Sequence, residues 1–173
     1  MRGPDWLCDL VRRTVMIASG EDRLRFAIEL SRRNVDERTG GPFGAAVFEK
    51  TGGRLVGAGV NRVVPLRRSA AHAEILAIAE AEADELFEPS ACELVSSAQP
   101  CLMCAGAAFW AGVSRVVYAA RRADVELLAG FDEGPIPPGL ETRGIEVCEA
   151  DEELRRLACA VLARYRAEGG QIY

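Results

Sequence analysis

The sequence predicts an α/β domain in which one mixed sheet carries helices on its faces. Two observations support this fold class. Short apolar segments typical of buried strands alternate with longer segments rich in helix formers. The 173 residues, 49% of them hydrophobic, suffice for one sizeable core, and domains mostly run to about 100 to 200 residues. We therefore divide the chain into an amino-terminal arm, residues 1–20, and a single domain, residues 21–173.

The elements are predicted in the order α-β-β-α-β-α-β-β-α. The arm has apolar residues at helical spacing and is expected to pack on the body or on a partner subunit. The first confident helix begins near Ser19, a typical N-cap residue with Asp22 three positions later. Gly52 and Gly53 turn one strand into the next, which predicts a hairpin. The other predicted elements are strands at 43–48, 54–60, 93–97, 115–119 and 145–148, helices at 72–83, 101–110 and 151–166, and a Gly- and Pro-rich loop through Leu140.

Composition disfavours several classes of partner. The net charge of −5 opposes binding to nucleic acid, because neutralising phosphates requires clustered Lys and Arg. No apolar run approaches the roughly 18 residues of a membrane span, and charged residues interrupt the first twenty positions where a signal peptide would be apolar. Six cysteines, two of them in a C-x-x-C pair, indicate reduced thiols and metal chemistry. We expect a cytoplasmic protein without a membrane partner.

Two short motifs carry the chemistry: His72-Ala73-Glu74 and the Pro100-led pair Cys101 and Cys104, each near the start of a predicted helix. Cysteines three positions apart on a helix face the same side and can hold one metal ion. A helix N-terminus favours the thiolate form that binds metal. With His72 as a third ligand, one tetrahedral position stays open, which is typical of a catalytic zinc ion. The motifs therefore predict one Zn²⁺ per subunit.

Glu74 is predicted to be the catalytic proton shuttle, because it lies two residues from His72 without having to bind the metal. Ala73, between the ligand and the acid, is placed among the substrate-binding residues. A redox dithiol is the main alternative for the two cysteines, but it leaves His72 and Glu74 unexplained. A lone histidine on a helix is more often a core residue, yet this one is the single His of the chain.

The combination of H-x-E with P-C-x-x-C is the signature of zinc-dependent base deaminases. On these motifs the chain resembles the cytidine and deoxycytidylate deaminase superfamily, and within it the bacterial guanine deaminase branch. The resemblance implies a three-layer α-β-α fold with a five-stranded mixed sheet and a homodimer with its active site near the interface. The matching positions are 40–45, Asn61, 72–74, 100–107, Trp110, 130–133 and Tyr173.

The resemblance also implies roles for individual residues. Asn61 would hydrogen-bond the substrate ring, and Phe43 and Trp110 would be aromatic neighbours of that ring. Glu133 would be a second catalytic carboxylate, and Tyr173 would help to close the pocket from a tail that crosses to the partner. Each residue also has a simpler interpretation: Asn61 as a turn residue, the two aromatics as core, Glu133 as a solvated acid and Tyr173 as a frayed end.

Two departures from the branch bear on the substrate. Gln99 stands where a Glu usually precedes the Pro of the C-x-x-C, and residues 65–70 differ from the usual short turn. In that stretch Arg67 and Arg68 fit either contact with an anionic substrate group or a solvated loop.

The leading hypothesis is deamination of a free aminopurine, guanine to xanthine and ammonia. The alternatives are a cytosine, nucleoside or triazine deaminase, a tRNA adenosine deaminase, which the acidic charge disfavours, and a zinc-stabilised interaction module without turnover.

Overall fold

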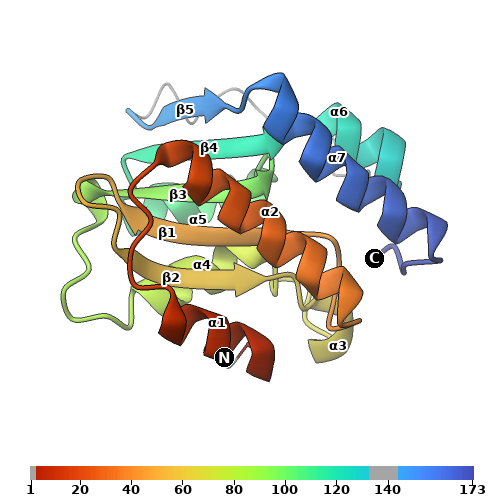
Figure 1. Cartoon of the computed structure of the whole chain (residues 1–173), viewed down its shortest axis with the longest axis horizontal. Helices are drawn as coiled ribbons and strands as arrows, with labels where there is room; N and C mark the ends of the chain where they lie inside the picture. Colours follow the sequence, from red (N-terminus) through yellow and green to blue (C-terminus); the bar gives the residue numbers. More distant parts are fainter. Residues whose placement is uncertain (1–2, 133–143) are drawn as a thin grey trace.

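The computed structural model describes residues 3–132 and 144–173 and contains one five-stranded mixed sheet (Figure 1). The strand order is β2-β1-β3-β4-β5. β1 pairs antiparallel with β2 and β3, whereas the β3–β4 and β4–β5 pairs are parallel. The predicted mixed sheet is therefore confirmed. The strands are β1 (Gly44–Glu49), β2 (Leu55–Val60), β3 (Cys92–Ala98), β4 (Arg115–Ala120) and β5 (Glu146–Glu149).

Helices cover both faces of the sheet, which gives the three layers that the resemblance implied. In Figure 1, α2 and α7 lie in front of the sheet and α4 and α5 behind it. The helices are α1 (Asp5–Arg13), α2 (Gly20–Asp36), α3 (Val63–Leu66), α4 (Ala73–Ala81), α5 (Leu102–Ala111), α6 (Arg122–Asp124) and α7 (Glu152–Ala167), with a 3₁₀ turn at Pro89–Ala91 and a π turn at Val125–Ala129.

β1 explains why the central strands read as apolar runs rather than as alternating patterns. Ala46 and Phe48 pack in the core under α2 and α7, while Ala45 and Val47 pack in the core under α4 and α5. Because successive side chains of a strand point to opposite faces, a sheet covered on both sides needs apolar residues at every position.

The start of α4 is held close to the sheet by a glycine. A Cβ on Gly59 of β2 would lie 2.2 Å from the backbone oxygen of Ala73, so no larger residue fits there without a shift of the helix. Since Ala73 is the first residue of α4, this contact fixes the position of the preceding His72. β2 thereby sets the height of the predicted metal ligand above the sheet.

Ser19 caps α2 as expected, its side chain accepting from the backbone N–H of Asp22.

Two segments differ from the sequence prediction. The predicted loop after β4, however, begins with helical turns over residues 122–129, a stretch that contains no Gly or Pro. Gly130 ends these turns with φ +84°. Residues 63–66, for which no helix was predicted, form the short helix α3. Pro65 is compatible with it, because a proline is tolerated in the first turn of a helix.

The amino-terminal arm forms the helix α1, which lies beside the edge strand β2 (Figure 1). Leu7 is its buried anchor. The division of the chain at residue 20 stays a prediction. Among the described residues, no helix is both long and apolar enough to cross a membrane.

Candidate active site

The three predicted metal ligands meet between the first turns of α4 and α5. His72 is the N-cap residue of α4 and Cys101 the N-cap residue of α5, both with extended backbone. The Cys101 and Cys104 Sγ atoms lie 3.5 Å apart. His72 Nδ1 lies 3.6 Å from Cys101 Sγ and 3.5 Å from Cys104 Sγ. Two motifs that are 29 residues apart in the chain are therefore brought to one point.

The spacing of these donors fits zinc. Zinc bonds are about 2.3 Å to sulfur and about 2.0 to 2.1 Å to nitrogen, so tetrahedral ligand atoms lie about 3.5 to 3.8 Å apart. The observed separations of 3.5 to 3.6 Å match that range. Within residues 3–132 and 144–173, this is the single group of three or more His, Cys, Asp or Glu side chains arranged to hold a metal ion. Three ligands leave the fourth position open for a reactant, which is typical of a catalytic site.

Local interactions shift the pKa values of the two sulfur ligands and of the neighbouring acid. The hydrogen bond with Cys104, together with the His72 ring, lowers the pKa of the Cys101 thiol to about 4, whereas the same hydrogen bond and burial raise the pKa of the Cys104 thiol. Glu74 lies in the first turn of α4 and is only 6% exposed, and this burial raises the pKa of its carboxyl above the ordinary value. Ser96 Oγ donates to Glu74 Oε1 across 3.4 Å. Glu74 is thus a buried acid held beside the ligands, with a raised affinity for a proton.

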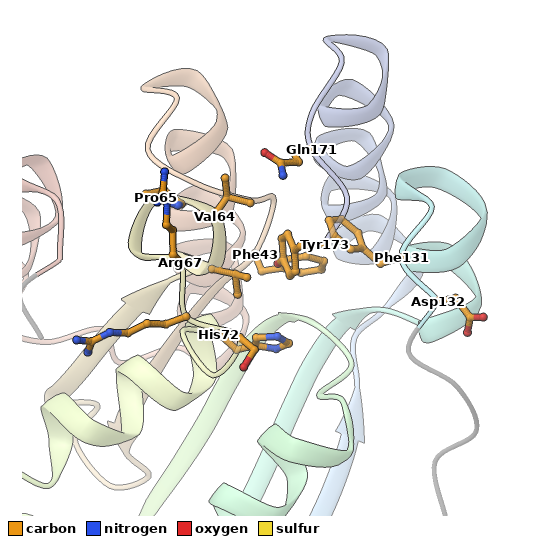
Figure 2. Close-up of a pocket in the computed structure, with 12 residues that line it drawn as sticks. Phe43, Val64, Pro65, Arg67, His72, Phe131, Asp132, Gln171 and Tyr173 are labelled. Atoms are coloured by element: carbon orange, nitrogen blue, oxygen red, sulfur yellow. The ribbon is translucent and has the colours of Figure 1, made fainter.

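A cavity of about 830 Å³ opens above His72. One wall is aromatic and consists of Phe43, Phe131 and Tyr173, which Figure 2 shows gathered above the His72 ring. The opposite wall is the segment 63–69. The cavity is thus a slot with an aromatic side and with His72, one of the three metal ligands, at its base.

The aromatic wall is built from three segments that are distant in the chain. Phe43 and Phe131 meet edge to face with ring centroids 5.3 Å apart, and Phe131 and Tyr173 lie 4.9 Å apart. Tyr173 also meets the His72 ring edge to face at 6.3 Å. The last residue of the chain therefore packs over the pocket of its own subunit. Exchange of this tail with a partner subunit stays a prediction.

Asn61 follows β2 and is almost fully buried, with 1% exposure. Its Oδ1 accepts from the backbone N–H of Val63 at 3.3 Å, as in a turn. Its Nδ2 is buried and, among the residues that the structure describes, has no acceptor. An unpartnered buried donor costs free energy, so this amide is suited to a ligand that brings its own acceptor.

Three predicted substrate-binding residues, Asn61, Ala73 and Trp110, are not among the described residues that line the cavity. Trp110 on α5 is 84% exposed and is not among the residues that line the cavity. Ala73 contributes only a fully buried methyl group at the start of α4. Glu133 lies outside the described residues. Their roles toward the substrate stay predictions.

The two positions at which the sequence departs from the guanine deaminase branch, Gln99 and residues 65–70, have different surroundings. Gln99 Oε1 accepts from the backbone N–H of Arg122 at 3.1 Å, so Gln99 joins β3 to the start of α6. Arg67 and Arg68 line the cavity mouth, and Arg67 adopts a left-handed backbone with φ 51°. In Figure 2 the Arg67 side chain extends away from the aromatic wall.

Two parts of the pocket were given no role from the sequence. Phe131 joins Phe43 to Tyr173, and Val63 and Val64 begin the opposite wall, of which the sequence linked only the residues from Pro65 onward to the substrate. The one signal for Phe131 was a large apolar residue between Gly130 and acidic neighbours in a stretch expected to be loop.

Comparison with known proteins places these features in context. Residues 18–120 match the family model described as the cytidine and deoxycytidylate deaminase zinc-binding region. The chain is 37% identical over 114 residues to a guanine deaminase of Bacillus subtilis (strain 168), covering 65% of this chain and 71% of that protein.

Two solved structures are similar over nearly the whole chain. A guanine deaminase from Nitrosomonas europaea is 47% identical, with a TM-score of 0.85 and coverage of 96% of this chain and 94% of that one. A structure in complex with 2,6-diaminopurine is also 47% identical, with a TM-score of 0.84 and coverage of 100% and 95%.

Proposed function

The chain belongs to the cytidine and deoxycytidylate deaminase family, a family of zinc-dependent hydrolases, and from this membership we infer that it deaminates a free aminopurine, converting guanine to xanthine and ammonia. The observation that carries the proposal is a set of three metal ligands beside a buried acid, with the ligand His72 at the base of a slot that has an aromatic wall. The relatives support the choice of ring, since two are guanine deaminases and another similar structure holds 2,6-diaminopurine.

The slot suits a planar heteroaromatic ring. Phe43, Phe131 and Tyr173 offer apolar surface on one side, where a flat ring gains from aromatic contact. Asn61 Nδ2 can donate a hydrogen bond to a ring nitrogen or to the oxygen of a ring carbonyl. We place the ring between this amide and the metal ligands, with its amino-bearing carbon above the base of the slot.

The proton transfers belong to Glu74. When bound, zinc supplies the Lewis acidity that makes water a nucleophile at neutral pH. Glu74 takes a proton from the attacking water, passes it to the ring nitrogen beside the amino-bearing carbon, and transfers the second proton to the departing amino group. Water thereby provides the oxygen of the new carbonyl group, and the amino group leaves as ammonia. Burial helps, because a carboxyl group with a raised pKa holds and releases protons closer to neutral pH.

The exposed face of α5 supports a homodimer. Leu102, Met103 and Trp110 are 56%, 39% and 84% exposed, and positions 103, 106 and 110 share one side of the helix. A second copy of the chain on this face would bury Trp110 at the end of α5 and also Leu102 and Met103 at its start, where the metal ligands lie. Six cysteines without disulfides support a cytoplasmic location.

Light scattering with the Trp110→Asp variant tests the dimer. We expect the unmodified protein to have the mass of two chains and the variant to have a lower mass, because a charge on this face disfavours its burial. Equal masses for both proteins would contradict the α5 interface.

A substrate panel tests the function. Ammonia release is measured with guanine, guanosine, adenine, cytosine, an aminotriazine and adenosine in a tRNA anticodon stem. We expect guanine to have the highest kcat/KM. Turnover restricted to cytosine or to tRNA would overturn the purine assignment, and the absence of turnover with every substrate by zinc-loaded protein would overturn the enzyme itself.

A further inference from the structure

Asn34, on the inner face of α2, connects the helix to the substrate-binding side of the pocket. It is fully buried, although it belongs to none of the recognised motifs. Its Nδ2 donates to the backbone oxygen of Gly41 at 2.8 Å and to that of Asn61 at 2.9 Å. Its Oδ1 accepts from Thr39 Oγ1 at 2.7 Å. The amino group and the oxygen of this side-chain amide therefore both have partners. The two carbonyl groups that accept from Asn34, those of Gly41 and Asn61, lie in different loops.

The loops are packed so closely around Asn34 that the contact requires glycine. A Cβ on Gly40 would lie 1.8 Å from the backbone oxygen of Asn61 and 2.8 Å from Asn34 Nδ2. A Cβ on Gly41 would lie 3.0 Å from Asn61 Oδ1 and 3.3 Å from the Tyr173 hydroxyl. The glycine pair therefore lets Asn34 reach Asn61 and lets Asn61 lie next to Tyr173.

The amino-terminal arm continues the same chain of hydrogen bonds. Trp6 Nε1 donates to Thr39 Oγ1 at 3.1 Å, so the hydroxyl proton of Thr39 is left to donate to Asn34 Oδ1. The Trp6 ring is held in place by the Arg33 guanidinium, 4.9 Å from its centroid. A flip of the Asn34 amide would place its oxygen against two carbonyl oxygens, so Thr39 and the two carbonyl groups together fix its orientation.

We propose that Asn34 is a positioning residue for substrate recognition by Asn61, and that Trp6 and Thr39 hold Asn34 in its working orientation. The inference rests on the proposed function, because it takes Asn61 Nδ2 as the donor to the purine ring. Asn61 is fixed at both of its backbone groups: its carbonyl accepts from Asn34, and its N–H donates to the Phe43 carbonyl at 3.0 Å. Within the part of the chain that the structure describes, its side chain is bonded only through Oδ1, so the direction of Nδ2 depends on this backbone.

The loss of this positioning is expected to raise KM more than it lowers kcat. Asn34 contacts the loops around Gly41 and Asn61, whereas Glu74 and the metal ligands belong to α4 and α5. A change that weakens ring binding equally in the ground state and the transition state appears in KM. A merely structural role would instead reduce the melting temperature and the amount of active enzyme without changing KM.

Steady-state kinetics of zinc-loaded enzyme with guanine test the proposal. We expect KM to rise about tenfold in Asn34→Ala, which removes three hydrogen bonds including both bonds to the loops. We expect a rise of about threefold in Thr39→Val, which removes the bonds to Asn34 and Trp6, and in Trp6→Phe, which removes one bond, with kcat within about twofold in all three variants. Thr39→Ser keeps the hydroxyl and is expected to retain the KM of the unmodified enzyme.

Ser114→Ala is the matched control. Ser114 Oγ also donates to a backbone carbonyl, that of Cys92 at 3.2 Å, at the far end of the sheet. We expect this variant to lose thermal stability without a change in KM.

An unchanged KM in both Thr39→Val and Trp6→Phe would overturn the proposal, and these mild variants decide the matter if Asn34→Ala does not fold. A fall in kcat with constant KM would overturn it as well. Failure of the unmodified enzyme to deaminate any purine is a separate result that overturns the proposed function.

Discussion

The two sides of the pocket are built in different ways. The base, with its metal ligands and Glu74, comes from two motifs at the N-termini of neighbouring helices, where the helix geometry itself sets the Cys101 to Cys104 distance. The aromatic wall instead collects Phe43, Phe131 and Tyr173 from three distant parts of the chain. The reaction chemistry is therefore encoded in two short motifs, whereas the shape that selects the ring depends on how the loops and the tail pack.

The largest expected effect is the loss of a metal ligand at the base. Cys104→Ala removes one of three donors, so we expect zinc content and deaminase activity to fall below detection. Metal analysis by mass spectrometry and the ammonia assay measure the two quantities. Cys159→Ala, the same change at a half-buried position on α7, is expected to retain both. A fully active Cys104→Ala enzyme would contradict the assigned ligand set.

The next effect separates proton transfer from metal binding within the base. Glu74→Gln keeps the size of the side chain but cannot accept a proton, so kcat is expected to fall by about 10²- to 10⁴-fold. KM and zinc content are expected to change little, because Glu74 is not among the three metal donors. If the variant lost its zinc in parallel with its activity, Glu74 would be part of the metal site instead of the proton shuttle.

The sequence predicted the base well because its information is local. A C-x-x-C pair at the start of a helix places two sulfurs on one side, and the single histidine two residues before an acid completes the pattern. The mixed sheet was likewise predictable from the order of strands and helices, with boundaries that moved by one residue for several strands. The donor atoms lie at distances that fit zinc because the start of α4, with His72, meets the start of α5, with Cys101 and Cys104.

The aromatic wall was only partly predictable because packing across long distances in the sequence decides it. Phe43 and Tyr173 came from the family resemblance, while Phe131 gave almost no local signal. Residues 122–129 contain no Gly or Pro, but the Gly- and Pro-rich stretch that follows led to the prediction of a loop, so the helical turns that carry Phe131 to the pocket were missed. Trp110, expected beside the substrate, lies exposed on α5, and its predicted role depends on a partner subunit.

A substitution in the aromatic wall is expected to have a smaller effect, which appears as a higher KM. Tyr173→Ala removes the ring that covers His72 and contacts Phe131, so we expect KM for guanine to rise about tenfold while zinc content stays constant. Steady-state kinetics with metal analysis check both. Ile172→Ala, a change at the exposed neighbouring residue, is the control and should retain the unmodified KM. Loss of zinc in Tyr173→Ala would show that the two sides are not independent.

The smallest effect concerns the anchor of the tail. Tyr165 on α7 is buried, and its hydroxyl donates to the backbone oxygen of Gln171 at 2.7 Å. Tyr165→Phe keeps the ring against Phe131 and removes only this bond, which ties the tail two residues before Tyr173.

One hydrogen bond is worth about 1 kcal/mol, so the covered form of the pocket becomes less populated and KM should rise about two- to threefold with kcat unchanged. Proteolysis of the tail by carboxypeptidase is expected to become faster as well, because it follows the population of the uncovered form. If KM rose as much as in Tyr173→Ala, this single bond would control the whole wall, and the wall would respond to local changes as sharply as the base does.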